Sequence, residues 1–417
     1  MRRRNFLKVG AGGVFASLLS PSRRARAAET AVQNPVFSVT DVPDGPFYDP
    51  AEPNRHAGVD SLLTLMGENG LKFYRSNMSR LLSGPPGLIA SGDVVLVKVN
   101  AQWKYRGATN SDVVRGIIQR ILDHPDGFTG EIVIIENGQG RGSLKCDTSS
   151  SYDNAAVHAN AVDERHSFVY LVDSLFKDRR VSAYLLDSIR AKFIGEADHG
   201  TDGYRKFENV SYPCFTTANG RRVELKDGIW NGSGYDANLK LLNVPVLKTH
   251  GGSEITASLK HFYGILTMND GQSPFRHYGG LGETCGKMVA AIRTPVLNIL
   301  DAVWVSHKAL EGYPAASTFK ANQLAAGQDP LALDYWAAKN ILYPINKNAN
   351  HHPDNATISA WMDAAGSTIN SRGGLLRPQD GILIGSVTRR EEEMLVRQTS
   401  ARLFAESRGN ARVRFRD

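Results

Sequence analysis

The sequence predicts an α/β fold, with a mostly parallel sheet flanked by helices and an irregular insertion. Residues 93–100 and 131–136 are near-continuous apolar runs, which is typical of strands covered on both faces. Between them, residues 113–122 repeat apolar side chains at helical spacing, and Thr109 or Asn110 can cap the helix. A strand, a helix and a strand in this order form a βαβ unit, so the two strands are expected to be parallel.

Further elements are expected on both sides of a less regular middle. Residues 239–247 read as another strand, and Pro245 indicates an irregular or edge position in it. The other expected strands are 296–305 and 323–327, and the expected helices are 59–83, 181–193, 256–266, 286–292 and 330–342.

The predicted organisation has four parts. They are a signal peptide at 1–27, an N-terminal extension with a helix at 28–90, an α/β domain at 91–345 with its insertion at about 138–238, and a C-terminal region at 346–417.

Residues 1–27 read as a twin-arginine export signal. Arg3 and Arg4 precede a short apolar run at 9–19, and the sequence from Ala25 to Ala27 offers a small-x-small cleavage site. The alternative is a basic, disordered N-terminus that contains two arginines by chance. The signal predicts export through the twin-arginine translocase to the periplasm or another exported location, with cleavage near Ala27.

Charge and hydropathy exclude two classes of function. Seven of the 49 lysines and arginines lie in residues 1–27, and the rest balance the 42 acidic residues. The mature chain therefore has no basic excess that would favour nucleic acid or an anionic membrane. No later segment has the apolar length of a membrane span.

The three cysteines, Cys146, Cys214 and Cys285, are too scattered for a disulfide framework. They form no C-x-x-C pattern, so we expect no iron–sulfur cluster held by this chain alone. One pair could form a disulfide in an oxidising compartment.

Lys248 and His250 close the predicted strand 239–247 and project to the same side. Ligand sites in open α/β sheets lie at the carboxyl ends of strands. Thr256 and Lys260 share one face of the predicted helix 256–266. These groups suit an anion, and His250 can titrate near neutral pH. The alternative is a solvated basic loop in which His250 serves as a cap.

Lys98 and Asn100 repeat this arrangement at an earlier strand end, unless Lys98 simply emerges from the sheet there. Asp329 is expected to cap the helix 330–342, with Pro at its first position. Asp301 and Asp334 stand in apolar surroundings, where an acid either pairs with a lysine or serves a site.

Two other motifs are weaker. The GQGRG sequence at 138–142 follows a strand but lacks the third glycine of a dinucleotide-binding turn, so a loop is predicted. His250, His261 and His277 could ligate a metal with Asp270, but no tight histidine spacing supports a metal site.

Four blocks of sequence follow one another between about residues 90 and 345. They are VLVKVN at 95–100 with ATN at 108–110, NVPVLKTH at 243–250 running into TASLKHFYG at 256–264, PVLNILDA at 295–302, and AGQDPLALD at 326–334. In this order they resemble the domain-of-unknown-function 362 family. The resemblance implies an α/β domain whose motif lysines, histidine and aspartates gather into one site, and it implies no settled reaction.

The chain departs from the family pattern in several places. Val99 stands where the family usually has proline, His261 stands where asparagine usually follows the lysine, and residues 307–314 replace a glycine-rich stretch. Many members carry ferredoxin-like cysteine clusters, which this chain lacks.

We therefore expect an exported enzyme that performs acid–base chemistry on a small anionic substrate, with no cofactor identified. The alternatives are a periplasmic anion- or cofactor-binding protein without turnover, or a metal-dependent enzyme. The expected catalytic residues are His250 for proton transfer, Lys248, Asp301 and Asp334, and the expected substrate-binding residues are Lys98, Asn100, Thr256, Lys260 and Asp329.

Overall fold

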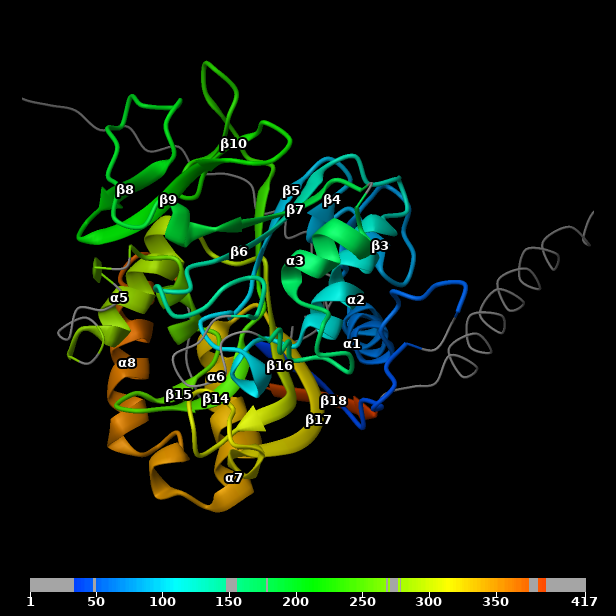
Figure 1. Cartoon of the computed structure of the whole chain (residues 1–417), viewed down its shortest axis with the longest axis vertical. Coiled ribbons are helices and arrows are strands. Elements are labelled where there is room, and N and C mark those ends of the chain that lie inside the picture. The colour runs from blue at the N-terminus through cyan, green and yellow to red at the C-terminus, as the bar shows by residue number, and fades with distance from the viewer. Residues whose placement is uncertain are drawn as a thin grey trace, which may run out of the picture. The chain divides into compact units, whose positions relative to one another are not determined.

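The computed structural model describes residues 34–47, 50–147, 156–177, 179–267, 269–270, 277, 279–374 and 382–387. The predicted export signal at 1–27 lies outside the described residues. The described chain forms an α/β fold, in which helices cover a large mixed sheet whose strand pairs are mostly parallel (Figure 1). This confirms the predicted fold class.

The main sheet has the strand order β18-β1-β17-β16-β13-β5-β6-β7, and β14 pairs with β15 and with β16. The pairs β16–β13, β13–β5, β5–β6 and β6–β7 are parallel, as the βαβ pattern predicted. The strands are β1 (Pro35–Thr40), β5 (Val94–Lys98), β6 (Glu131–Glu136), β7 (Val181–Leu185), β13 (Leu239–Asn243), β14 (Val246–His250), β15 (Glu254–Thr256), β16 (Leu297–Ser306), β17 (Thr318–Gly327) and β18 (Ile382–Val387).

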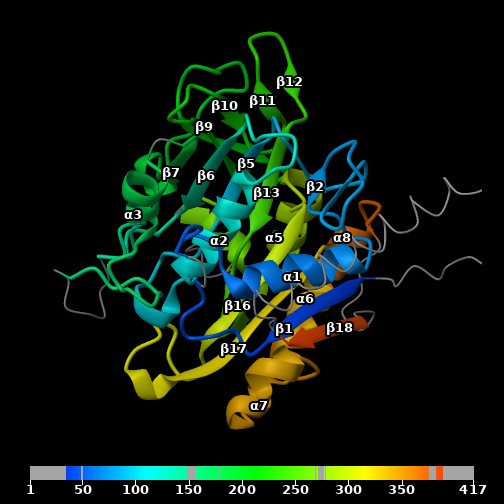
Figure 2. The same ribbon diagram turned by 90° about the vertical axis from the view of Figure 1, so that its right-hand side faces the viewer.

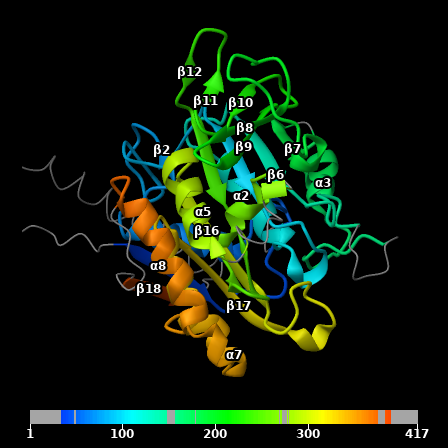
Figure 3. The same ribbon diagram turned by 90° about the vertical axis from the view of Figure 1, so that its left-hand side faces the viewer.

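Both faces of the sheet are buried, and alternate residues of one strand serve the two faces. In β5, Val95 and Val97 join the core beneath α1 (Ala57–Glu68) and α2 (Ser111–Leu122), which Figure 2 shows in front of the strands. Val94 and Leu96 join the opposite core. The helices there are α5 (Leu281–Lys287), α6 (Pro330–Ala337) and α8 (Ala356–Asn370), of which α5 and α8 face the viewer in Figure 3. The two-residue period of a strand therefore explains its continuous apolar run.

Two smaller sheets complete the described fold. Residues 203–236, within the predicted insertion, form an antiparallel sheet of β8 (Gly203–Phe207), β9 (Val210–Thr216), β10 (Arg222–Glu224), β11 (Gly228–Trp230) and β12 (Tyr235–Asp236). A short parallel sheet contains β2 (Tyr74–Arg75), β3 (Ser83–Gly84) and β4 (Ile89–Ala90).

Short helical segments connect these elements. They are η1 (Tyr105–Gly107), α3 (Phe168–Tyr170), η2 (Leu171–Leu175), η3 (Leu186–Ser188), η4 (Lys260–Gly264), η6 (Met288–Ile292), η7 (Ala315–Ser317), η8 (Ala338–Leu342), α7 (Tyr343–Asn346) and η9 (Ala349–His351). No helix among the described residues has both the length and the apolar character needed to cross a bilayer.

The caps that the sequence indicated are present. The Asn110 side chain accepts the N–H groups of the first turn of α2, and Asp329 does the same for α6, where Pro330 is the first residue. Pro245 separates β13 from β14, which confirms the irregularity expected at that position.

Three predicted helices were wrong in extent or type. The first ends at Glu68, because the chain reverses at Gly70, whose φ is +90°. Residues 181–185 form strand β7 instead of a helix, because they pair along β6 and tertiary pairing overrides local preference. In the predicted helix 256–266, Thr256 belongs to β15, and only residues 260–264 form a 3₁₀ helix, η4.

Candidate functional site

A cavity of about 510 Å³ lies where β5, β6 and β14 end. Five of the nine residues that the sequence singled out line it, namely Asn100, Lys248, His250, Thr256 and Lys260. Its other lining residues are Gln102, Glu136, Asn137, Gln139, Arg141, Gly251, His261, Tyr263, Gly264, His277 and Leu310. The carboxyl ends of parallel strands thus meet at one site, as is usual for ligand sites in open α/β sheets.

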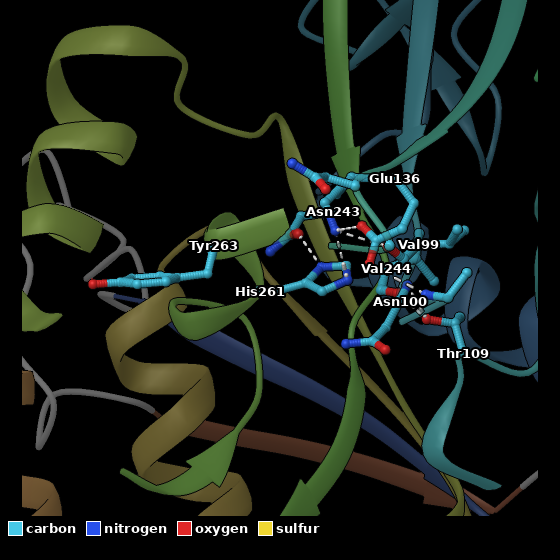
Figure 4. Close-up of polar contacts among 12 residues, drawn as sticks. Val99, Asn100, Thr109, Glu136, Asn243, Val244, His261 and Tyr263 are labelled. Atoms are coloured by element: carbon cyan, nitrogen blue, oxygen red, sulfur yellow. Dashed lines mark hydrogen bonds and ion pairs between the residues drawn. The ribbon is translucent and has the colours of Figure 1, made fainter. Parts of the chain in front are cut away.

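The loop after β5 is fixed by one threonine. The Thr109 hydroxyl accepts the backbone N–H of Asn100 at 2.8 Å and donates to the carbonyl of Val244 at 2.8 Å, as Figure 4 shows. This bridge joins the ends of β5 and β13. It positions the Asn100 side chain, which lines the cavity.

Lys98 lies behind the cavity wall and forms a buried ion pair with Glu136, which lines the cavity. Its ammonium donates to the carboxylate of Glu136, to the carbonyl of Val99 at 2.7 Å and to Nε2 of His261 at 3.1 Å. Burial lowers the pKa of Lys98 and raises that of Glu136 to about 7, while their mutual attraction opposes both shifts. All three ammonium protons of Lys98 have acceptors, so the position of this side chain is fixed.

His261 is locked in one tautomer. Its Nδ1 lies 2.7 Å from Oδ1 of Asn243 (Figure 4). The side-chain nitrogen of Asn243 donates to Ser258 and Asn298, so its Oδ1 is an acceptor. Nδ1 therefore carries the proton, and Nε2 accepts from Lys98. Burial, reinforced by Lys98, holds the pKa of His261 well below its ordinary value. The Tyr263 ring points away from this network (Figure 4).

Lys248 differs from Lys98 in its partners. Its Nζ donates to the carbonyl of Gly107 at 2.5 Å and lies 3.5 Å from Oδ1 of Asn100. Thr256 faces it directly across the β14–β15 ladder, and both side chains line the cavity. Lys248 is 1% exposed, and burial lowers its pKa to about 7, with the positive charge of Lys260 adding to the effect.

Lys260 and two histidines form a chain of nitrogens at the cavity. Nε2 of His277 lies 3.2 Å from Nζ of Lys260 and 3.2 Å from Nε2 of His250. Nδ1 of His250 donates to the carbonyl of Gly251 at 2.6 Å, since a carbonyl can only accept. Burial lowers the pKa of Lys260 to about 8, and burial together with Lys260 lowers that of His250 to about 2. His250 is therefore neutral near pH 7.

The cavity rim carries amides and a guanidinium. Gln139 and Arg141 come from the loop at 138–142, whose Gly138 and Gly140 donate backbone N–H groups to Asp187. This confirms the loop predicted in place of a dinucleotide-binding turn. Gln102 donates to the Gln139 side chain at 3.3 Å. With the two lysines, these groups form a polar, positively charged site.

The three predicted aspartates do not line the cavity. Asp301 accepts the N–H groups of Asn110 and Val303, so it anchors the start of α2. Asp334 accepts those of Ser258 and Leu259 at 2.7 and 2.9 Å, just before η4. Burial raises the pKa of both carboxyl groups to about 7. Asp329 caps α6, and Lys98 lies behind the wall, so four predicted residues are outside the lining.

The described residues hold no group of three histidine, cysteine or acidic side chains arranged for a metal. His261 turns toward Lys98 and Asn243, away from the pair formed by His250 and His277. All three cysteines are buried as free thiols.

Sequence reasoning missed Glu136 as a site residue. The available signal was the one used for Lys98, namely a charged residue at the end of an apolar strand. The rim residues Gln102, Gln139 and Arg141 gave no such signal, because loops rich in polar residues are common at protein surfaces.

Residues 231–339 match the model of a family described as a domain of unknown function (DUF362). The matched segment contains β12 to β17 and all of α6, including Lys248, Lys260 and the three aspartates. No curated protein and no solved structure matches the chain. From β12, the last strand of the insertion, to α6, the chain therefore resembles the DUF362 family.

Proposed function

We propose that the cavity binds a small anionic substrate and that the protein is an enzyme that transfers a proton on that substrate. The observation that carries this proposal is the convergence of Lys248, Lys260 and the amide of Asn100 on one cavity. The nearby Lys98–Glu136 pair is neutral as a unit, so the two cavity lysines dominate the local charge.

Lys248 is the group assigned to proton transfer. A general acid or base works best when its pKa lies near the working pH, and the pKa of Lys248 is about 7. His250 is a poorer base at neutral pH, because its pKa is about 2 and both ring nitrogens have partners. This assignment moves the proton-transfer role from His250, where the sequence pattern alone placed it, to Lys248.

The other cavity residues bind and orient the substrate. Lys260 supplies a second positive charge, and Arg141 adds a guanidinium at the rim. Thr256 and Asn100 flank Lys248 and offer hydrogen bonds of defined direction. Asp334 holds the backbone before η4, which carries Lys260.

Exchange of substrate hydrogen with deuterium is the test for proton transfer. Small carboxylates and phosphate esters are incubated with the protein in D₂O, and loss of each C–H signal is followed by proton NMR. We expect exchange in one substrate class, abolished in Lys248→Met and kept in the exposed-lysine control Lys192→Met. Binding of the anion without exchange in any of them would instead favour a binding protein without turnover.

We also propose that the chain is exported through the twin-arginine translocase, which rests on the sequence of residues 1–27. Replacing Arg3 and Arg4 by lysines is expected to retain the protein in the cytoplasm, measured by cell fractionation and immunoblotting. Unchanged export in this variant would contradict the proposal.

A further inference from the structure

The lysines of the site fall into two kinds by their partners. Lys98 gives all three protons to acceptors, one of them a carboxylate. Lys248 has one close acceptor, the carbonyl of Gly107, and a longer contact to Asn100. Lys248 lines the cavity, and no described carboxylate lies within ion-pair distance of its Nζ. A cavity lysine without a counter-ion has the setting of a nucleophilic amine.

We propose that Nζ of Lys248 is a nucleophile that forms an imine with the carbonyl carbon of a 2-oxo acid bound in this cavity. The inference rests on the proposed anion site and adds to it the chemical class of the substrate, a carbonyl group next to a carboxylate. In this inference Lys248 acts as the nucleophile in place of the proton-transfer group.

The carboxylate of such a substrate has partners on the cavity wall. Lys260 packs with its Nζ 5.1 Å from the centre of the Tyr263 ring, which favours a cation at that place. Arg141 lies at the rim and presents the planar guanidinium that binds carboxylates with two hydrogen bonds. A substrate whose carboxylate is held there has its adjacent carbonyl in the same cavity that Lys248 lines.

The attacking amine must be neutral, and its surroundings favour that form. Burial and the charge of Lys260 disfavour the ammonium of Lys248, as they do for amines that form imines in other enzymes. In the neutral state one N–H still donates to Gly107, while the lone pair is available to the cavity.

The step balances without an oxidant or reductant. The Nζ lone pair forms a C–N bond to the carbonyl carbon as the C–O π bond breaks, and the oxygen takes a proton to give a carbinolamine. The carbinolamine nitrogen keeps one proton; its lone pair forms the C=N bond as the C–O bond breaks, and that proton goes to the departing hydroxyl, which leaves as water, so amine and ketone give imine and water. Thr256, opposite Lys248, is placed to relay a proton to the departing oxygen.

Borohydride trapping tests this inference on the purified full chain. The protein is incubated with pyruvate, reduced with sodium borohydride, digested and analysed by peptide mass spectrometry. We expect one reduced pyruvyl adduct per chain, located on Lys248. At saturating pyruvate the initial trapping rate is expected to rise with pH through about 7, because the neutral amine becomes more abundant.

Two variants serve as controls. Lys248→Arg keeps a positive charge but cannot form an imine, so we expect it to lose the adduct while still binding pyruvate in a thermal-shift assay. Lys192→Arg changes an exposed lysine and is expected to keep the adduct.

The experiment distinguishes a failure of imine formation at Lys248 from a failure of the anion site. An adduct on Lys260, or one spread over surface lysines, would overturn the assignment to Lys248. Binding of pyruvate with no adduct in the native chain would overturn imine formation and leave the anion site intact. Absence of stabilisation by pyruvate, phosphate or any other anion tested would overturn the anion site itself.

Discussion

Removal of the carboxylate charge at Glu136 is expected to lower the stability of the fold by several kcal/mol. The Glu136→Gln side chain has nearly the same shape but leaves the Lys98 ammonium, which is 0% exposed, without a counter-ion. Breaking a buried pair by neutralising one partner typically costs about 3–5 kcal/mol. The contacts of Lys98 to Val99 and His261 remain, so we expect about 3 kcal/mol, the lower end of that range.

The assay is urea unfolding followed by circular dichroism and tryptophan fluorescence, with the change in unfolding free energy taken from the shift in midpoint. Lys98→Met is expected to cost a similar amount, and the double variant less than the sum of the two, with a coupling of about 1–3 kcal/mol.

A matched control lies on α5, where Lys287 and Glu283 form an ion pair with 2.7 Å between charged atoms and a half-exposed carboxylate. Glu283→Gln is expected to cost no more than about 0.5 kcal/mol, because solvent screens this pair. The reasoning is refuted if Glu136→Gln costs as little as this control, or if the two changes in the buried pair are simply additive.

Three further predictions concern the cavity and its supports. Anion affinity should be highest below pH 7 and fall as the pH rises through 8. The reason is that Lys248 and Lys260, with pKa values of about 7 and 8, bind anions only when protonated. Calorimetry with phosphate at about pH 6 and about pH 9 measures this change in affinity. Gly264→Ala places a Cβ 2.5 Å from both charged groups of the buried pair and should cost about 1–3 kcal/mol in urea unfolding, whereas Gly195→Ala, in open space, should not. Asp334→Asn loses an acceptor for one of two buried N–H groups and should cost about 1–3 kcal/mol by the same assay.

Each of these predictions has a contrary result. Equal phosphate affinity at the two pH values would remove the cavity lysines from anion binding. A Gly264→Ala protein as stable as its Gly195→Ala control would mean that the ion pair can shift. Asp334→Asn without a stability loss would mean that the carboxylate does not hold the backbone before η4.

The sequence predicts strands and helix caps correctly where a residue pattern has a single local physical cause. Residues 94–97 and 132–135 are apolar at every position because each face of the strand is covered, and that burial requires no knowledge of which helix covers which face. The Asn110 and Asp329 caps are equally local, since each side chain binds N–H groups two and three residues along the chain.

Partners distant in sequence were not predictable in the same way. Asp301 was a candidate catalytic acid because it stands in an apolar strand, but its carboxylate binds the N–H of Asn110, 191 residues away. Lys98 was expected to orient substrate, whereas the neighbouring strand brings Glu136 against it. In both cases the sequence indicated a buried charged group that needs a partner. The identity of the partner depends on which segments lie next to the strand in the folded chain.

The sequence by itself determined the fold class, the βαβ unit and the gathering of Asn100, Lys248 and His250 at strand ends, because apolar periodicity and chain direction are local properties. Only the tertiary structure decided that Lys98 is fixed by three acceptors while Lys248 faces a cavity and has no carboxylate at ion-pair distance among the described residues. Whether a buried amine is inert or reactive depends on the charges and acceptors around it, and those are set by elements that meet only when the chain folds.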